Sequence, residues 1–147
     1  MTQINLFKLI HAVELMNNEN IIQFTKTFRY PLGISPILVL AELKSKDPQK
    51  QSELAETIGY TKGAMTHIAA KLTDLGLVER LDNANDRRAI QLAITPAGER
   101  ALAEAQHIGQ ELFKQHFAVL NDAEIDQYLT IQEKLIQGIR ARKQSTT

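Results

Sequence analysis

The sequence predicts a mainly α-helical fold with a small β-wing: a winged helix-turn-helix lobe flanked by N- and C-terminal helices. Three observations lead to this fold class. Two short helical patterns are joined by a Gly-containing turn, as in a helix-turn-helix. Two short apolar strands separated by a charged turn follow them directly. Long helical patterns of apolar residues occupy both ends of the chain.

Length and composition limit the class of protein. With 147 residues, 44% of them hydrophobic, the chain can form one domain with helical extensions and is too apolar to be disordered. Its apolar runs are too short to span a bilayer, and its N-terminus lacks the features of a secretory signal. The absence of cysteine excludes disulfides, Cys-ligated zinc and thiol-based redox sensing. We therefore expect a soluble cytoplasmic protein without a membrane segment.

The N-terminal segment has the apolar spacing of a helix. The pattern runs from Ile4 to Asn17, with apolar residues at Leu6, Leu9, Ile10, Val13 and Met16. The polar run from Asn17 to Asn20 is expected to fray or kink this helix before apolar residues resume at Ile21. The sequence from Tyr30 to Gly33 then predicts a turn, because the residue before a proline avoids the helical region.

The two helices of the helix-turn-helix lie in the next segment. A preceding helix is expected to begin with Ser35 as N-cap and Pro36 at its first position, and to end near Asp47-Pro48. A short helix from Gln51 to Ile58 then turns its apolar face inward. Gly59 suits the end of that helix, where a positive φ is common.

The second helix of the motif, here called the reading helix, begins at the N-cap Thr61 and stops at Gly76. Its apolar stripe consists of Met65, Ile68, Ala69, Leu72 and Leu75. A strand from Leu77 to Leu81, a charged turn from Asp82 to Arg88 and a strand from Ala89 to Ile94 form the predicted wing.

Two long helices are predicted after the wing. Thr95-Pro96 begins the first, and Asn121 with Glu124 three residues later indicates a capping box at the start of the second. The tail, residues 144–147, is expected to be disordered.

The apolar stripes from Leu6 to Met16 and from Ile125 to Ile139 have no partner within a lone lobe, so we predict an obligate dimer that buries them. We treat residues 1–147 as a single domain, with a lobe at 34–100 and dimerisation helices at 1–30 and 101–143.

Three short motifs follow one another along the predicted lobe. They are Ser52–Glu56 before the turn, Gly76–Arg80 after the reading helix, and Asp86–Arg88 followed by Thr95 and Gly98. In this order and spacing they resemble the MarR family of bacterial transcriptional regulators. The resemblance implies a homodimer with a triangular helical body, two winged-helix lobes and a small-molecule or stress input. It also implies repression of a near-palindromic operator more often than activation.

On this basis we expect the double-stranded DNA operator to contact Ser52, Thr61, Lys62, Gly63, Thr66, His67, Lys71, Arg80, Asp86, Arg87 and Arg88. Recognition helices enter the major groove by their N-terminal turns. Thr66 can donate, accept or offer a methyl group to thymine, and His67 can donate to a purine acceptor. Lys62 and Lys71 suit phosphates. The alternative is that these are ordinary solvated residues on an amphipathic helix.

The remaining contacts belong to the wing and to the first helix of the motif. The family places an arginine in the minor groove, and Arg88 is the matching position, with Asp86 two residues earlier able to orient its guanidinium. Arg87 would point to phosphate or solvent. Arg80 would contact phosphate or form a surface ion pair, and Ser52 would contact phosphate or cap its own helix.

The balance of basic and acidic residues supports an alternative function. Seventeen Lys and Arg residues balance seventeen Asp and Glu residues, and the stretch from Lys44 to Arg88 holds eight basic against seven acidic residues. Nucleic-acid binders usually show a basic excess, so a winged helix that binds protein without DNA is the first alternative. Many members of the family carry arginine or another polar residue where this chain has His67, so no base preference can be transferred.

Other classes have weaker signals. No Gly-rich phosphate loop, nucleophile elbow or carboxylate pair is readable, so we expect neither an enzyme nor a cofactor. His107 and Glu111 are four residues apart, but two ligands do not make a metal site, which leaves a metal-responsive regulator as a second alternative. Phe24, Phe28 and Tyr30 are candidate walls of an effector pocket, with ordinary core packing as their alternative.

Overall fold

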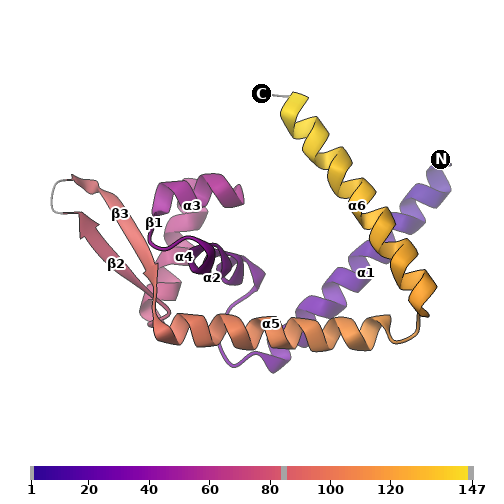
Figure 1. Cartoon of the computed structure of the whole chain (residues 1–147), viewed down its shortest axis with the longest axis horizontal. Helices are drawn as coiled ribbons and strands as arrows, with labels where there is room; N and C mark the ends of the chain where they lie inside the picture. Colours follow the sequence, from indigo (N-terminus) through magenta and orange to yellow (C-terminus); the bar gives the residue numbers. More distant parts are fainter. Residues whose placement is uncertain (1, 84–85, 146–147) are drawn as a thin grey trace. The chain divides into compact units, whose positions relative to one another are not determined.

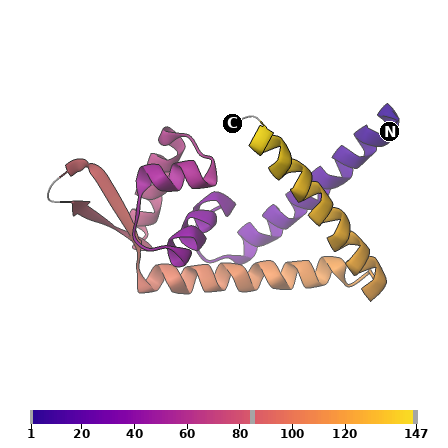
Figure 2. The same ribbon diagram turned by 45° about the horizontal axis from the view of Figure 1, so that its top comes forward.

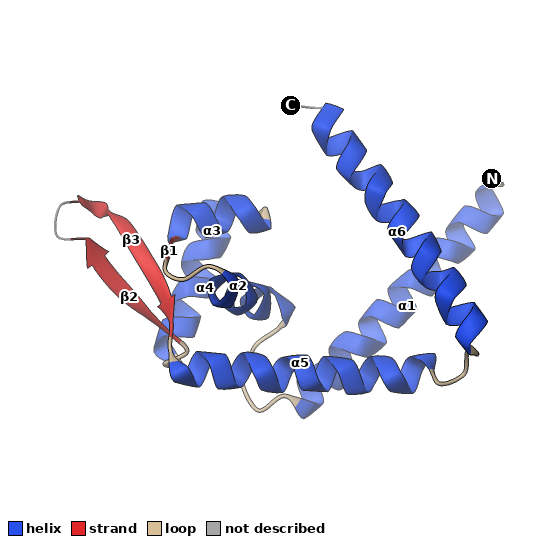
Figure 3. Ribbon diagram, in the orientation of Figure 1, coloured by secondary structure: helices blue, strands red, loops and turns tan. Residues whose placement is uncertain are grey.

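The computed structural model describes residues 2–83 and 86–145, with side chains throughout except at residues 83–89. The described residues form six helices and a three-stranded antiparallel sheet, which confirms the mainly α fold with a small β-wing (Figures 1 and 3). The elements are α1 (Gln3–Thr27), α2 (Ile34–Ser45), β1 (Gln49–Lys50), α3 (Gln51–Ile58), α4 (Lys62–Asp74), β2 (Val78–Asn83), β3 (Asp86–Ile94), α5 (Pro96–Phe117) and α6 (Asp122–Ser145).

The chain divides into two units, residues 1–110 and residues 111–147. The core of the first unit is formed by α2 to α5 and the sheet. Its largest fully buried side chains are Val39, Leu40, Leu43, Leu54, Met65, Leu72, Leu77, Leu92 and Leu102. Burying one such side chain stabilises a fold by roughly 1.5–3 kcal/mol, so this cluster fixes how the reading helix α4 sits against α2, α3 and the sheet.

The sheet has the strand order β1-β3-β2. Arg80 on β2 and Gln49 on β1 both pair with Leu92 of the central strand β3. β1 was not predicted, because two residues are too short to show an alternating pattern. Its Gln49 is buried, and its side-chain amide donates to the carbonyl oxygens of Glu42 at 3.1 Å and Lys46 at 2.6 Å. These bonds tie the strand to the end of α2.

The wing strands are longer than predicted. β2 continues to Asn83 and β3 begins at Asp86, so the backbone of Asp86, Arg87 and Arg88 lies in a strand and not in the turn. The charged residues misled the prediction, since a solvated antiparallel ladder accepts polar side chains. The pairing is irregular between Leu81 and Asn83. In Figures 1 and 2 the two strands extend beyond α3 and α4.

Two helix predictions were wrong in detail. α2 begins at Ile34 after the N-cap Gly33, so Ser35 is not the N-cap and Pro36 is the third helical residue. A proline is tolerated there because N–H groups of the first turn have no intrahelical acceptor. α1 continues unbroken through the polar run at residues 17–20, which lies on exposed or half-exposed helix surface where polar side chains cost little.

The predicted caps are largely confirmed. Thr61 Oγ1 accepts the backbone N–H of Ala64 at 3.1 Å, and α3 ends at Gly59 with a φ of 87°. Asn121 and Glu124 form the reciprocal capping box, with Asn121 Oδ1 accepting from the Glu124 N–H at 2.8 Å. α6 continues to Ser145, so residues 144 and 145 of the predicted disordered tail are helical, while residues 146–147 lie outside the described residues.

The two terminal helices share an unusual property. Neither α1 nor α6 contains a buried residue, although both carry many apolar side chains. On α6 the exposed ones include Ile125, Tyr128, Leu129, Leu135, Ile136 and Ile139. On α1 they include Leu6, Leu9, Ile10, Val13 and Met16. A search of the described helices finds none that is long and apolar enough to cross a membrane.

Candidate nucleic-acid interface

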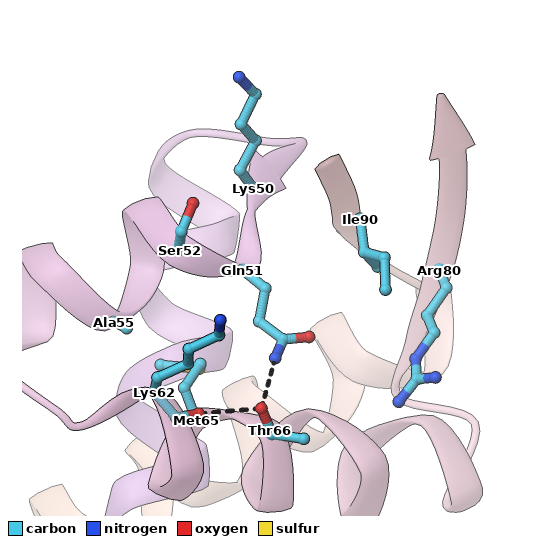
Figure 4. Close-up of a pocket in the computed structure, with 9 residues that line it drawn as sticks. All are labelled: Lys50, Gln51, Ser52, Ala55, Lys62, Met65, Thr66, Arg80 and Ile90. Carbon is cyan, nitrogen blue, oxygen red and sulfur yellow. Dashed lines mark hydrogen bonds between the residues drawn. The ribbon is translucent and has the colours of Figure 1, made fainter. Parts of the chain in front are cut away.

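A hollow of about 450 Å³ lies where the starts of α3 and α4 meet the wing (Figure 4). The residues that line it are Lys50, Gln51, Ser52, Ala55, Lys62, Met65, Thr66, Arg80 and Ile90. Figure 4 shows Lys62 and Arg80 on opposite sides of the hollow, one on the reading helix and the other on β2. The fold thus brings residues of α3, α4 and both wing strands, together with Lys50 of β1, to one concave surface.

The charge of this surface differs from that of the whole chain. Three of the lining residues are cations (Lys50, Lys62 and Arg80), and none of these nine described residues is acidic. The chain as a whole has a net charge of zero. The local excess of positive charge comes from the fold, since Lys50 and Arg80 are thirty positions apart in the sequence.

Local structure explains the placement of each polar group. Lys62 is the first residue of α4, directly after the Thr61 cap, and Thr66 lies one turn further on. Ser52 is the second residue of α3, and Gln51 is the first. The starts of two helices therefore border the hollow, and their free N–H groups carry partial positive charge. An anionic backbone approaching this surface would meet cations and helix N-termini together.

A hydrogen-bonded chain links α3 to the reading helix. Gln51 Nε2 donates to Thr66 Oγ1 at 3.1 Å, and Thr66 Oγ1 donates to the Lys62 carbonyl oxygen at 2.9 Å. Sequence reasoning missed Gln51 as well as Lys50. Nothing in the spacing of the sequence marks Gln51, because its partner is on another helix fifteen residues away.

The predicted contact residues fall into three groups. Ser52, Lys62, Thr66 and Arg80 line the hollow. The residues Thr61, Gly63, His67 and Lys71 are exposed at α4 or its cap but do not belong to the lining. The side chains of Asp86, Arg87 and Arg88 lie outside the described part of the structure, although their backbone belongs to β3.

The predicted effector wall is an aromatic cluster at the end of α1. The Phe28 ring centroid lies 5.0 Å from that of Phe24 and 5.6 Å from that of Tyr30. Phe28 is buried, with 5% of its surface exposed, so it packs as a core residue. The Arg29 guanidinium lies 5.1 Å from the Tyr30 ring centroid and 3.4 Å from a Glu104 carboxylate oxygen, which ties the cluster to α5.

His107 and Glu111, the two residues with metal-compatible spacing, acquire no third ligand among the residues described. In that part of the chain, no group of three or more His, Asp or Glu side chains is close enough to hold a metal ion. Glu111 instead pairs with Lys114, at 3.2 Å between Oε1 and Nζ.

Comparisons with known proteins point to one family. The family model described as "MarR family" matches residues 34–90. The chain is 32% identical over 108 residues to the HTH-type transcriptional repressor MdtR of Bacillus subtilis, covering 72% of this chain and 70% of that protein. It is 29% identical over 107 residues to the transcriptional repressor MprA of Escherichia coli, covering 73% of this chain and 61% of that repressor.

The fold agrees with solved structures. A mutant MarR from Escherichia coli, crystallised in complex with operator DNA, superimposes with a TM-score of 0.73 at 20% sequence identity. The superposition covers 89% of this chain and 95% of the other. At this level of identity the likeness concerns the fold alone.

Proposed function

The chain belongs to the MarR family of winged helix-turn-helix transcriptional regulators, and on that premise we propose that it is a homodimeric repressor of a near-palindromic DNA operator. The family is one of regulators and not of enzymes. Two similar proteins, MdtR and MprA, carry the name of transcriptional repressor. Since these relatives are bacterial, we place the proposed activity in the bacterial cytoplasm, with a small-molecule or stress signal relieving repression.

One observation carries the proposal: the cation-lined hollow beside the N-terminal turns of the reading helix. Phosphate contacts from Lys and Arg provide most of the affinity of DNA-binding proteins and fix the register of the protein on the duplex. In our proposal Lys50, Lys62 and Arg80 supply these contacts, while Thr66 and His67 face base edges in the major groove. The zero net charge of the whole chain had favoured the protein-binding alternative. It does not count against DNA binding in this proposal, because Lys50, Lys62 and Arg80 line one surface on which a duplex could lie.

Dimerisation is the second part of the proposal. The apolar residues of α1 and α6 are exposed in the single chain, and large exposed apolar patches mark interaction surfaces. Joined through these helices, two lobes would place their reading helices about one turn of DNA apart, roughly 34 Å. An effector could relieve repression only by binding more tightly to a dimer with a different lobe spacing. The site predicted at Phe24, Phe28 and Tyr30 remains a prediction.

The decisive experiment is selection of bound sites from a random pool of duplex DNA, followed by footprinting on the enriched sequence. We expect one near-palindromic sequence, protected over two adjacent major-groove segments. Affinity should fall steeply with salt, because each neutralised phosphate releases counterions. Recovery of no preferred sequence, with binding only to a protein partner, would favour the protein-interaction alternative. Elemental analysis of the purified protein would identify a metal-responsive regulator.

The wing arginine gives the first mutational prediction. Arg88→Ala should weaken operator binding by roughly 1–3 kcal/mol, the scale of one groove contact, because a guanidinium in the minor groove interacts with strong negative potential. The dimer and its melting temperature should be unchanged. Fluorescence anisotropy on the selected operator measures the affinity, and Arg87→Ala, which removes a phosphate contact or a solvated side chain, should weaken binding less than Arg88→Ala. Equal operator affinity for Arg88→Ala and the unmodified chain would refute the wing contact.

His67 gives a prediction about specificity. Replacing His67 with alanine should change which operator variants bind best, because a base contact discriminates between sequences. Competition binding against a set of single-base operator variants measures this ranking. A uniform loss of affinity for every variant would instead mean that His67 contacts the DNA backbone or serves a structural role.

A further inference from the structure

The hydrogen-bonded chain from Gln51 through Thr66 to Lys62 restricts what the reading helix can offer to a base. We propose that Gln51 positions Thr66 so that its methyl group, and no hydrogen-bond donor, faces the DNA, and that Thr66 thereby selects a thymine. This inference rests on the proposed function. Gln51 acts through Thr66 and is a positioning residue, whereas Thr66 is the residue that touches the base.

Counting protons decides the role of the hydroxyl. A threonine hydroxyl has one proton and two lone pairs. The proton is donated to the Lys62 carbonyl oxygen at 2.9 Å, and one lone pair accepts the Gln51 amide at 3.1 Å. Because no second proton exists, Thr66 cannot donate to the O6 or N7 of guanine or to the O4 of thymine. It retains one lone pair and its methyl group.

Gln51 also fixes the side-chain rotamer. Threonine in a helix divides between two χ1 rotamers, because its hydroxyl can bond to a preceding carbonyl. The Gln51 amide comes from another helix and contacts the hydroxyl in one particular position, so it favours a single rotamer. In Figure 4 the Thr66 methyl group points away from Lys62, toward the side of the hollow where Arg80 lies. Thr66 as a residue is exposed, so a duplex can reach it.

A methyl group recognises a specific feature of DNA. In the major groove, the 5-methyl group of thymine is the apolar feature that distinguishes it from the other bases, and threonine methyl groups pack against it. Deoxyuridine lacks only this methyl group. Burying one methyl group contributes enough free energy to change a dissociation constant by about fourfold. Replacement of the contacted thymine by deoxyuridine should therefore weaken binding about fourfold in each half-site.

The test uses the full-length protein and the operator selected from the random pool, with each thymine replaced in turn by deoxyuridine. The unmodified protein should lose about fourfold in affinity at one thymine per half-site. Thr66→Val, which keeps a methyl group and removes the hydroxyl, should keep that loss. Thr66→Ser, which keeps the hydroxyl and removes the methyl group, should bind the thymine and deoxyuridine operators equally at that position.

Gln51→Ala tests the positioning role in two backgrounds. In the unmodified protein it should reduce the fourfold preference for thymine over deoxyuridine. In the Thr66→Val protein it should leave that preference unchanged, because valine has no hydroxyl for Gln51 to hold. Thermal unfolding of all variants checks that each is folded.

Three results would overturn the inference. They are a preference that survives in Thr66→Ser, an equal effect of Gln51→Ala in both backgrounds, and a selected operator in which every deoxyuridine is neutral. In each of these cases a specific operator has been found, so the proposed function stands. If the random pool yields no specific sequence, the proposed function itself fails.

Discussion

Replacing Gly98 with alanine should lower the free energy of unfolding by about 3 kcal/mol or more, the upper range for an overpacked site. A Cβ at this position would collide with the backbone carbonyl oxygen of Leu77 and would lie 2.8 Å from Ile94 Cγ1. The carbonyl cannot move away at low cost, because the Thr95 N–H donates to the same oxygen at 3.1 Å. For a chain of this length, the loss corresponds to a melting temperature lower by roughly 10 °C.

The neighbouring hydrogen bonds explain why the site cannot relax. The Thr95 hydroxyl donates to the Gly76 carbonyl oxygen at 2.7 Å and accepts the Gly98 N–H at 3.0 Å. The start of α5 is thus fixed to the segment between the reading helix and the wing, so displacing Gly98 would disturb how the wing meets α4. The operator affinity of the folded fraction should fall as well.

A matched control is available in the same helix. Gly109 also lies within α5, but a Cβ added there meets nothing within 4 Å. Gly109→Ala should therefore be neutral or stabilising by up to about 1 kcal/mol, the usual gain for alanine over glycine inside a helix. Urea unfolding followed by circular dichroism compares the two variants. If Gly98→Ala is as stable as Gly109→Ala, the close contact with Leu77 does not constrain the fold.

Signals local in the sequence predicted most of the fold. The short helix α3 has the predicted bounds, Gln51–Ile58, because its apolar face and the following Gly59 are both local features. Thr61 and the Asn121 capping box were predicted for the same reason, since a cap and its partner lie within one helical turn. The start of α2 was misplaced because Ser35-Pro36 matches a cap motif that the observed backbone does not use.

Features that depend on tertiary structure were not predictable. β1 exists because its two residues pair with Leu92 and Gln91 of a strand about forty positions later. Counting charges between Lys44 and Arg88 gave near balance, whereas the fold gathers Lys50, Lys62 and Arg80 around one hollow. Gln51 was overlooked because its role follows from a bond to Thr66 on a different helix. The residues that line this hollow are distant from one another in the sequence, so their proximity cannot be predicted from a single sequence.

Replacing Leu135 with lysine should convert the proposed dimer into monomers. Leu135 lies on α6 with 57% of its surface exposed, in a stripe with Tyr128 and Ile139 at helical spacing. In a twofold dimer the substitution occurs twice, and each copy loses roughly 1.5–3 kcal/mol of apolar burial and introduces a charge. The dissociation constant of the dimer should rise by about 100-fold or more. Sedimentation equilibrium measures this change directly.

Gln137→Lys is the matched control, because it adds the same charge to α6 on the side of the helix away from the stripe. Gln137 lies two residues further on and about 200° around the helix, and it is exposed. Gln137→Lys should remain a dimer with unchanged operator affinity. Leu135→Lys should bind the selected operator much more weakly, because a monomer engages one half-site where the dimer engages two. Helix content by circular dichroism should be the same in both variants. If Leu135→Lys retains the dimer constant of the unmodified chain, this stripe of α6 is not the dimer interface, and the coupling between two reading helices must come from another surface.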